Sequence, residues 1–201
     1  GLKIGTDTAG NFRDITFDNI VIHNPDDDVQ GAEGGVNLCA LDGGFVQNIN
    51  ISNVVMKNVQ CPFYLIGGCR EKQQQSYRTP RPGSMSGVFL SNLQAEGTRV
   101  PPFVVGHEEQ PIAKISITNV DIRKSGGAYT TLPPKFEQQK GYPTPYMFGR
   151  EGQDDLPAYG IYLRNAKRIR LRDLWIDSEE PDVRPCFCAE YSSDIDIDPP
   201  L

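Results

Sequence analysis

Apolar and polar residues alternate along five segments of the chain, and one Asn or Asp interrupts the alternation in each. The segments are ITFDNIVI (15–22), INISNVVM (49–56), VFLSNLQA (88–95), ISITNVDI (115–122) and IRLRDLWI (169–176). Strict alternation predicts a β-strand with one buried and one exposed face. The interrupting residues are Asn19, Asn53, Asn92, Asn119 and Asp173. Of all residue types, only Gly tolerates the left-handed backbone conformation better than Asn and Asp do. We therefore expect each strand to bend at its Asn or Asp.

A second class of short apolar segment precedes each bent strand. Its members are GLKIG (1–5), GVNLC (35–39), PFYLIG (62–67), PFVVG (102–106) and GIYLR (160–164), and PCFCA (185–189) leads into DIDID. The chain therefore repeats a short strand, a connection and a bent strand, with an irregular period of roughly 27 to 40 residues. This pattern predicts an all-β fold, a right-handed parallel β-helix of about six coils, in which the Asn and Asp side chains form a structural ladder from coil to coil.

An antiparallel β-sandwich is the main alternative fold. It predicts hairpin turns such as Asn-Gly or Asp-Gly between strands, and Asp42-Gly43-Gly44 is the clear case in this sequence. We therefore favour the β-helix, as one domain over residues 1–201. Two segments without periodicity, residues 70–83 and 125–158, are predicted to be loop inserts on one face of it.

Composition narrows the classes of partner. The 201 residues, 38% of them hydrophobic, suffice for one core and argue for one domain. A net charge of -6 leaves no basic surface for nucleic acid. No run approaches the ~18 apolar residues that a membrane span needs. Strand-like sequence begins at Gly1, so we expect the chain to start inside a larger protein.

The cysteines and acidic residues predict no cofactor and no metal site. Five cysteines make an odd number, and none has the CxxC spacing of a zinc site. A Cys61–Cys69 disulfide is the alternative to free thiols at those two positions. The run Asp26-Asp27-Asp28 lacks the spaced ligands of a calcium loop and suggests a charged turn.

The order of the segments carries a family resemblance. GLKIGTDTAGNFRDITFDNIVIHN, followed by GGVNLCALDGGFVQNINISNVVMKNVQCPFYLIGGC, resembles the latter half of a family 28 glycoside hydrolase, the polygalacturonase-like group. LPAYGIYLRNAKRIRLRDLWID, followed by RPCFCAE, is similar to the end of bacterial members. The resemblance implies inverting hydrolysis of galacturonan or rhamnogalacturonan, and a secreted or periplasmic location.

The same resemblance implies that the catalytic residues lie upstream of this chain. Family members use Asp residues in Asn-x-Asp and Gly-Asp-Asp segments, a His in Gly-His-Gly, and an Arg-Ile-Lys segment. Gly1 matches the last Gly of Gly-His-Gly, and Asn37 and Cys39 occupy the positions of the Arg and the Lys. We predict no catalytic residue here and no activity of this chain alone. Asp154 and Asp155 form a pair, but in the Pro-rich insert, where a solvated loop is expected.

Substrate contacts are predicted along the short strands. If Leu2, Ile4, Val36, Leu38, Phe63, Leu65, Ile161 and Leu163 point inward, the residues between them form an outward row. Tyrosines in that row could stack on sugar rings, and Arg side chains could bind carboxylates. The row consists of Lys3, Asn37, Cys39, Tyr64, Tyr162 and Arg164, and all of these except Cys39 are predicted contacts. Arg70, which begins the loop insert 70–83, and His107, at the end of a strand, are predicted contacts as well. For the charged members, a solvated surface position is the alternative.

Three functions remain open from the sequence. The chain is the C-terminal segment of a pectin-type polysaccharide hydrolase, a carbohydrate-binding β-helix without chemistry, or a structural repeat segment such as part of an adhesin. The first two predict a polysaccharide or oligosaccharide as partner. A first coil with bare strand edges also predicts that preceding coils or another chain cover that end.

Overall fold

The computed structural model describes residues 1–25, 32–69, 81–125 and 156–198, and within these ranges the chain forms twelve β-strands and no helix. The strands make two six-stranded sheets. The short strands form one sheet, which we call the odd sheet. It contains β1 (Leu2–Ile4), β3 (Gly34–Ala40), β5 (Cys61–Gly67), β7 (Phe103–Val105), β9 (Ile161–Arg164) and β11 (Phe187–Glu190).

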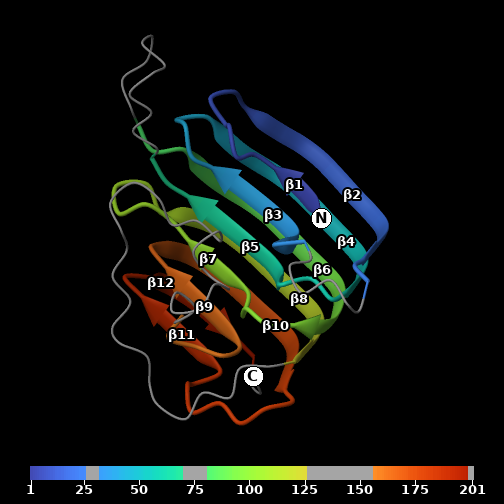
Figure 1. Ribbon diagram of the computed structural model, residues 1–201. Helices are drawn as coiled ribbons and strands as arrows, with labels where there is room; N and C mark the ends of the chain where they lie inside the picture. The colour runs from blue at the N-terminus through green and yellow to red at the C-terminus, as the bar shows by residue number, and fades with distance from the viewer. Residues whose placement is uncertain (26–31, 70–80, 126–155, 199–201) are drawn as a thin grey trace.

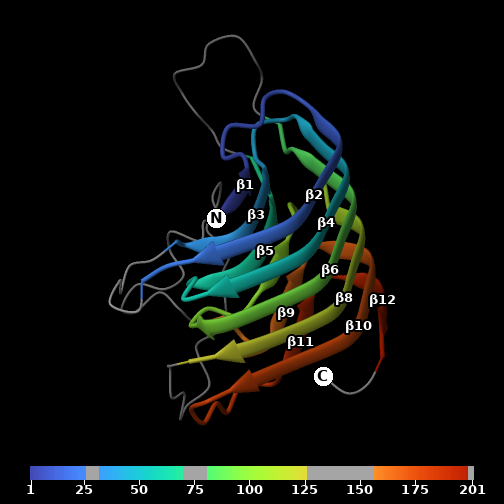
Figure 2. The same cartoon turned by 90° about the vertical axis from the view of Figure 1, so that its right-hand side faces the viewer.

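The long strands form the second sheet, which we call the even sheet. It contains β2 (Phe12–His23), β4 (Phe45–Lys57), β6 (Ser84–Thr98), β8 (Ile112–Lys124), β10 (Ala166–Ser178) and β12 (Ser193–Ile197). In Figure 2 the strands β2, β4, β6, β8 and β10 of this sheet lie side by side as arrows that point the same way. The segments with an interrupted alternation all fall in this sheet, and the short apolar segments all fall in the odd sheet.

Each neighbouring pair of strands is parallel, in both sheets. The chain changes sheet at every strand and moves one place along the stack at each return, so the order in each sheet follows the sequence (Figure 1). The prediction of an all-β fold with parallel strands is confirmed. The antiparallel sandwich is wrong, because Asp42-Gly43-Gly44 joins β3 to β4, which lie in different sheets.

Two columns of left-handed residues bend the even sheet. The predicted column is confirmed: Asn19, Asn53, Asn92, Asn119 and Asp173 have φ between 50° and 57°, and strand register aligns them across the sheet. A second column, which we call the earlier column, lies five positions before the Asn column in β2, β4, β6, β8 and β10 and continues onto β12, with φ between 53° and 67°. Its members are Asp14, Asn48, Gly87, Lys114, Arg168 and Asp194.

The hydrophobic core fills the space between the two sheets. The apolar positions of the alternating strands point into it, and Ile49, Ile51 and Val54 of β4 are fully buried. The predicted inward residues of the odd sheet also belong to it: Ile4, Val36, Leu38, Phe63, Leu65, Ile161 and Leu163 are buried there, and Leu2 packs against it. On the edge strand β2, Ile15 and Ile20 are only half-buried.

All five cysteines are free thiols, so the alternative of a Cys61–Cys69 disulfide is wrong. Cys61 is buried, and burial raises the pKa of its thiol. Its sulfur lies 3.2 Å from the carbonyl oxygen of Phe63. Within the described ranges no group of His, Cys, Asp or Glu side chains could hold a metal ion, and no helix is long and apolar enough to cross a membrane. The Asp26–Asp28 run, and residues 70–80 and 126–155 of the predicted inserts, lie outside these ranges.

Candidate carbohydrate-binding surfaces

The predicted contact row exists on the outer face of the odd sheet. Strand register aligns Lys3 with Asn37, Asn37 with Tyr64, Tyr64 with Phe103, and Phe103 with Tyr162. A neighbouring row aligns Cys39 with Ile66, Ile66 with Val105, and Val105 with Arg164. The sequence therefore predicted correctly which residues share one face.

The prediction that the aromatic side chains of this row lie open to a sugar is wrong. Tyr64 is 1% exposed and Tyr162 is 0% exposed. Tyr64 stacks on Phe103, with ring centroids 5.4 Å apart and planes 8° from parallel. The physical reason is a second hydrophobic cluster on the outside of the odd sheet, in which Val100, Leu156 and Ala158 pack against the tyrosines. Side chains without accessible surface cannot stack on a ligand.

Asn37 is also closed to solvent, at 6% exposed. Its Nδ2 donates to the carbonyl oxygen of Gly34 at 3.3 Å, and its Oδ1 accepts no hydrogen bond. The close approach requires a glycine, because a Cβ on Gly34 would lie 2.0 Å from that Oδ1. A sugar contact at Asn37 therefore has no support in the geometry.

Arg164 makes an ion pair and a ring contact on the same sheet. Its Nη1 donates to Oε2 of Glu190 at 2.7 Å, and the hydroxyl of Tyr162 donates to the same oxygen at 2.7 Å. The guanidinium carbon lies 4.9 Å from the ring centroid of Tyr191. Burial raises the pKa of Tyr162, which stays a neutral donor to the carboxylate. This cluster joins β9 to β11, so a structural role accounts for its contacts.

The remaining predicted contacts are scattered. Lys3 is exposed on the edge strand β1. His107 is partly exposed after β7, and its Nδ1 accepts a hydrogen bond from the backbone N–H of Glu109 at 3.2 Å. Roles in sugar binding for these two residues stay predictions. Arg70, Asp154 and Asp155 lie outside the described residues.

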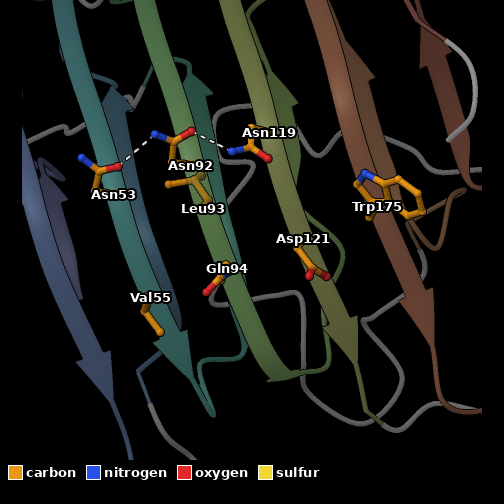
Figure 3. A pocket seen from close by; sticks show the side chains of 8 residues that line it. All are labelled: Asn53, Val55, Asn92, Leu93, Gln94, Asn119, Asp121 and Trp175. Atoms are coloured by element: carbon orange, nitrogen blue, oxygen red, sulfur yellow. Dashed lines mark hydrogen bonds between the residues drawn. The ribbon is translucent and has the colours of Figure 1, made fainter.

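The open surface lies instead on the even sheet. There, beyond the bend at the Asn column, a shallow groove of about 590 Å³ crosses β4, β6, β8 and β10 (Figure 3). One side of it is formed by Asn53, Asn92 and Asn119. The other side is a row that strand register aligns, and its members are Val55, Gln94, Asp121 and Trp175.

Exposed apolar surface is concentrated in this row. Trp175 is 67% exposed and Val55 is 47% exposed, and Val21 extends the row onto β2 at 77%. A second groove of about 360 Å³ adjoins the first, where Lys57, Glu96 and Arg123 form the next outward row. Aromatic and aliphatic side chains interleaved with amides and charges give this face the chemistry of a binding surface.

The Asn column is an exposed ladder of hydrogen bonds with one direction. Nδ2 of Asn119 donates to Oδ1 of Asn92 at 2.8 Å, and Nδ2 of Asn92 donates to Oδ1 of Asn53 at 2.9 Å. Nδ2 of Asn53 donates to Oδ1 of Asp18 at 2.8 Å. Oγ of Ser52 donates to the same oxygen at 2.8 Å, and the hydrogen bonds from Ser52 and Asn53 lower the pKa of Asp18. Asn19 stands in the column but donates to its neighbour Asp18 at 3.0 Å.

The direction of the ladder yields a stability prediction at its other end. Asp173 is aligned with Asn119, and both residues belong to the described part of the chain. No hydrogen bond joins these two described side chains, however. Oδ1 of Asn119 and the carboxylate are both acceptors. Asp173→Asn supplies a donor, so we expect the free energy of unfolding to rise by about 0.5–1 kcal/mol in urea denaturation. Asp177→Asn, outside the column on the same strand, is the control. An equal gain in both variants, or none in Asp173→Asn, contradicts the ladder extension.

Comparison with known proteins adds no relative: no protein-family model, no curated protein and no solved structure matches this chain.

Proposed function

We propose that this chain is the C-terminal segment of a pectin-type polysaccharide hydrolase with a right-handed parallel β-helix, and that it supplies scaffold rather than catalytic carboxylates. Support comes from the two parallel sheets, through which the chain advances one strand at each return. Left-handed residues at equivalent positions of successive strands are the corners that such a coil requires. The order of the segments that resemble the polygalacturonase-like family gives the substrate class.

The observation that carries the catalytic part of the proposal is the shortage of carboxylates on the odd sheet. Its six strands contain one, Glu190, and that side chain is held by Arg164 and Tyr162. Inverting glycoside hydrolysis needs an acid and a base about 6.5–9.5 Å apart, with room for a water between them. In this proposal both carboxylates come from coils that precede Gly1. The same coils, or another chain, cover the half-buried apolar residues of β2.

The test compares two preparations, the 201-residue chain alone and the chain extended by the residues that precede Gly1 in its natural polypeptide. We expect the extended protein to release reducing sugar from polygalacturonan or rhamnogalacturonan with inversion at the anomeric carbon, followed by NMR. The chain alone should release none. Hydrolysis by the chain alone would contradict the upstream position of the carboxylates. An extended protein that folds and cleaves neither polymer would remove the hydrolase assignment.

A non-catalytic carbohydrate-binding β-helix is the second candidate function. The groove on the even sheet favours it over a purely structural repeat, because Trp175 and Val55 leave apolar surface exposed beside a row of amides. The two candidates are compatible, since binding and hydrolysis would use different sheets.

A further inference from the structure

The groove beside the Asn ladder combines two kinds of group in adjacent rows. Figure 3 shows the amides of Asn53, Asn92 and Asn119 in one row, and Val55, Gln94, Asp121 and Trp175 following them toward the strand ends. The rows cross four neighbouring strands of one sheet, so equivalent side chains recur at the strand spacing of about 4.8 Å. That spacing is close to the length of one pyranose unit in an extended glycan.

The ladder leaves hydrogen-bonding capacity for a ligand. A side-chain amide has two N–H donors and two acceptor lone pairs. Asn92 uses one of each within the ladder, and Asn119 uses one donor. The remaining N–H groups and lone pairs lie on an exposed face, and the ladder fixes the orientation of the amides. Sugar hydroxyls, which both donate and accept, match such a row.

Trp175 supplies the apolar contact that a sugar ring requires. Its side chain is 67% exposed and lines the groove together with Asp121 of the neighbouring strand. The face of an indole ring attracts the weakly positive C–H groups on one face of a pyranose. An exposed Trp in the row beside the amides, on the last strand of the groove, therefore offers one stacking position next to hydrogen-bonding positions.

The charge of the groove selects among glycans. Its lining contains one ionisable side chain, the carboxylate of Asp121, and no cation, while in the adjoining row the cations of Lys57 and Arg123 flank the carboxylate of Glu96. A polygalacturonate chain, with one carboxylate on each unit, would face repulsion from Asp121 and from the net charge of -6. We propose that this groove binds a neutral polysaccharide chain that runs across β4, β6, β8 and β10, with one sugar ring on Trp175. This site goes beyond the proposed hydrolase function, because it lies on the other sheet and takes a substrate of different charge, and it rests on the second candidate function, for which it names the ligand class.

The chain offers a direct probe of this site, because Trp175 is its single tryptophan. Titrations use neutral hexasaccharides of β-1,4-galactan, β-1,4-mannan and β-1,4-glucan, and a hexagalacturonate of the same length, up to 10 mM. Tryptophan emission and calorimetry are followed together. We expect at least one neutral hexasaccharide to shift the emission saturably and to bind at least about fivefold tighter than hexagalacturonate.

Three variants localise the site. Trp175→Ala should weaken calorimetric binding about tenfold or more, which is the effect of losing about 1.4 kcal/mol. Phe89→Ala is the matched control: Phe89 is 50% exposed on the same sheet but does not line the groove, and we expect less than a twofold change. Asp121→Asn keeps a polar group and removes the charge, so hexagalacturonate should gain affinity at least threefold.

Several outcomes would overturn the proposal. These are no saturable response to any neutral hexasaccharide, tighter binding of hexagalacturonate, or equal losses in Trp175→Ala and Phe89→Ala. A change of emission with protein concentration alone would identify a second copy of the chain as the occupant and would also overturn it. Failure here leaves the release of reducing sugar by the extended protein unaffected, so the two proposals fail separately.

Discussion

Replacement of Asp182 by Asn should lower the free energy of unfolding by about 3–5 kcal/mol, the usual cost of breaking a buried ion pair. Asp182 lies between two cations: its Oδ2 accepts from Nζ of Lys124 at 2.8 Å and from Nη2 of Arg184 at 2.6 Å. Its Oδ1 also accepts from Nε of Arg184 at 2.9 Å. The three side chains are at most 2% exposed. The variant leaves Lys124 and Arg184 buried without the carboxylate that neutralises them.

The contacts of Arg184 show what the cluster stabilises. Its Nη1 donates to the carbonyl oxygen of Leu156 at 3.0 Å, and Leu156 belongs to the second hydrophobic cluster outside the odd sheet. Lys124 ends β8 in the even sheet. The ion-pair cluster therefore connects the even sheet to the second hydrophobic cluster, which covers the odd sheet. We expect its loss to loosen the packing of that hydrophobic cluster over Tyr64 and Tyr162 as well.

The pH dependence of stability gives a second measurement of the same prediction. Burial alone would raise the pKa of Asp182, but hydrogen bonds from Arg184 and Lys124 outweigh it and hold the pKa below its ordinary value. A carboxyl with a lowered folded pKa stabilises fully above its unfolded pKa of about 3.9, and this contribution is lost as the pH falls toward the folded value. The free energy of unfolding should therefore fall more steeply in acid for the wild-type protein than for Asp182→Asn.

Asp196→Asn is the matched control for urea denaturation. Asp196 also contacts two arginines, Arg170 and Arg172, but its side chain is 58% exposed. Exposed ion pairs contribute about 0–1 kcal/mol. Similar losses of unfolding free energy in Asp182→Asn and Asp196→Asn would show that burial of the Asp182 cluster does not determine how much it stabilises the protein.

The sequence predicted the face of each strand better than it predicted what covers that face. Register confirms that Lys3, Asn37, Tyr64 and Tyr162 form one row, because alternation determines which side chains share a face. Alternation contains no information on the packing of distant segments such as Leu156 and Ala158 against Tyr64. A signal was present nonetheless: CPFYLIG is apolar at almost every position, which is typical of a strand buried on both faces.

The groove on the even sheet was missed although its main residue is visible in the sequence. In IRLRDLWI, Trp175 occupies a polar phase of the alternation between Leu174 and Ile176, which are buried. A large aromatic side chain at such a position is predicted to be exposed. Its alignment with Asp121, Gln94 and Val55 depends on register across three other strands, which alternation alone does not give.

The two bend columns differ in how readily the sequence reveals them. The Asn column has Asn in four strands and Asp in the fifth, so residue type alone predicts it. The earlier column includes Lys114 and Arg168, which have no preference for positive φ, and it was not predicted. Its conformation therefore comes from the strand pairing on both sides, which holds equivalent positions of adjacent strands in one geometry.

The importance of residue type in the Asn column can be measured at Asn92, in the middle of the ladder. Its φ is 55°, and its side chain donates to Asn53 and accepts from Asn119. A β-branched residue in the left-handed region adds about 1–2 kcal/mol of strain, and the lost hydrogen bonds contribute about 1 kcal/mol more. Asn92→Val should therefore lower the free energy of unfolding by about 2–3 kcal/mol.

Two further variants, in the same urea denaturation series, distinguish the effect of the positive φ from the effect of the lost side-chain hydrogen bonds. Asn92→Gly accepts the positive φ but removes the amide, so we expect a loss of only about 1 kcal/mol. Gln94→Val introduces the same side chain two positions along β6, at an exposed position without a positive φ, and should change stability by less than about 0.5 kcal/mol. Equal losses for Asn92→Val and Asn92→Gly would mean that the amide ladder alone stabilises the bend. A loss in Asn92→Val no larger than in Gln94→Val would mean that the bend is held by strand pairing whatever residue occupies it, as at Lys114.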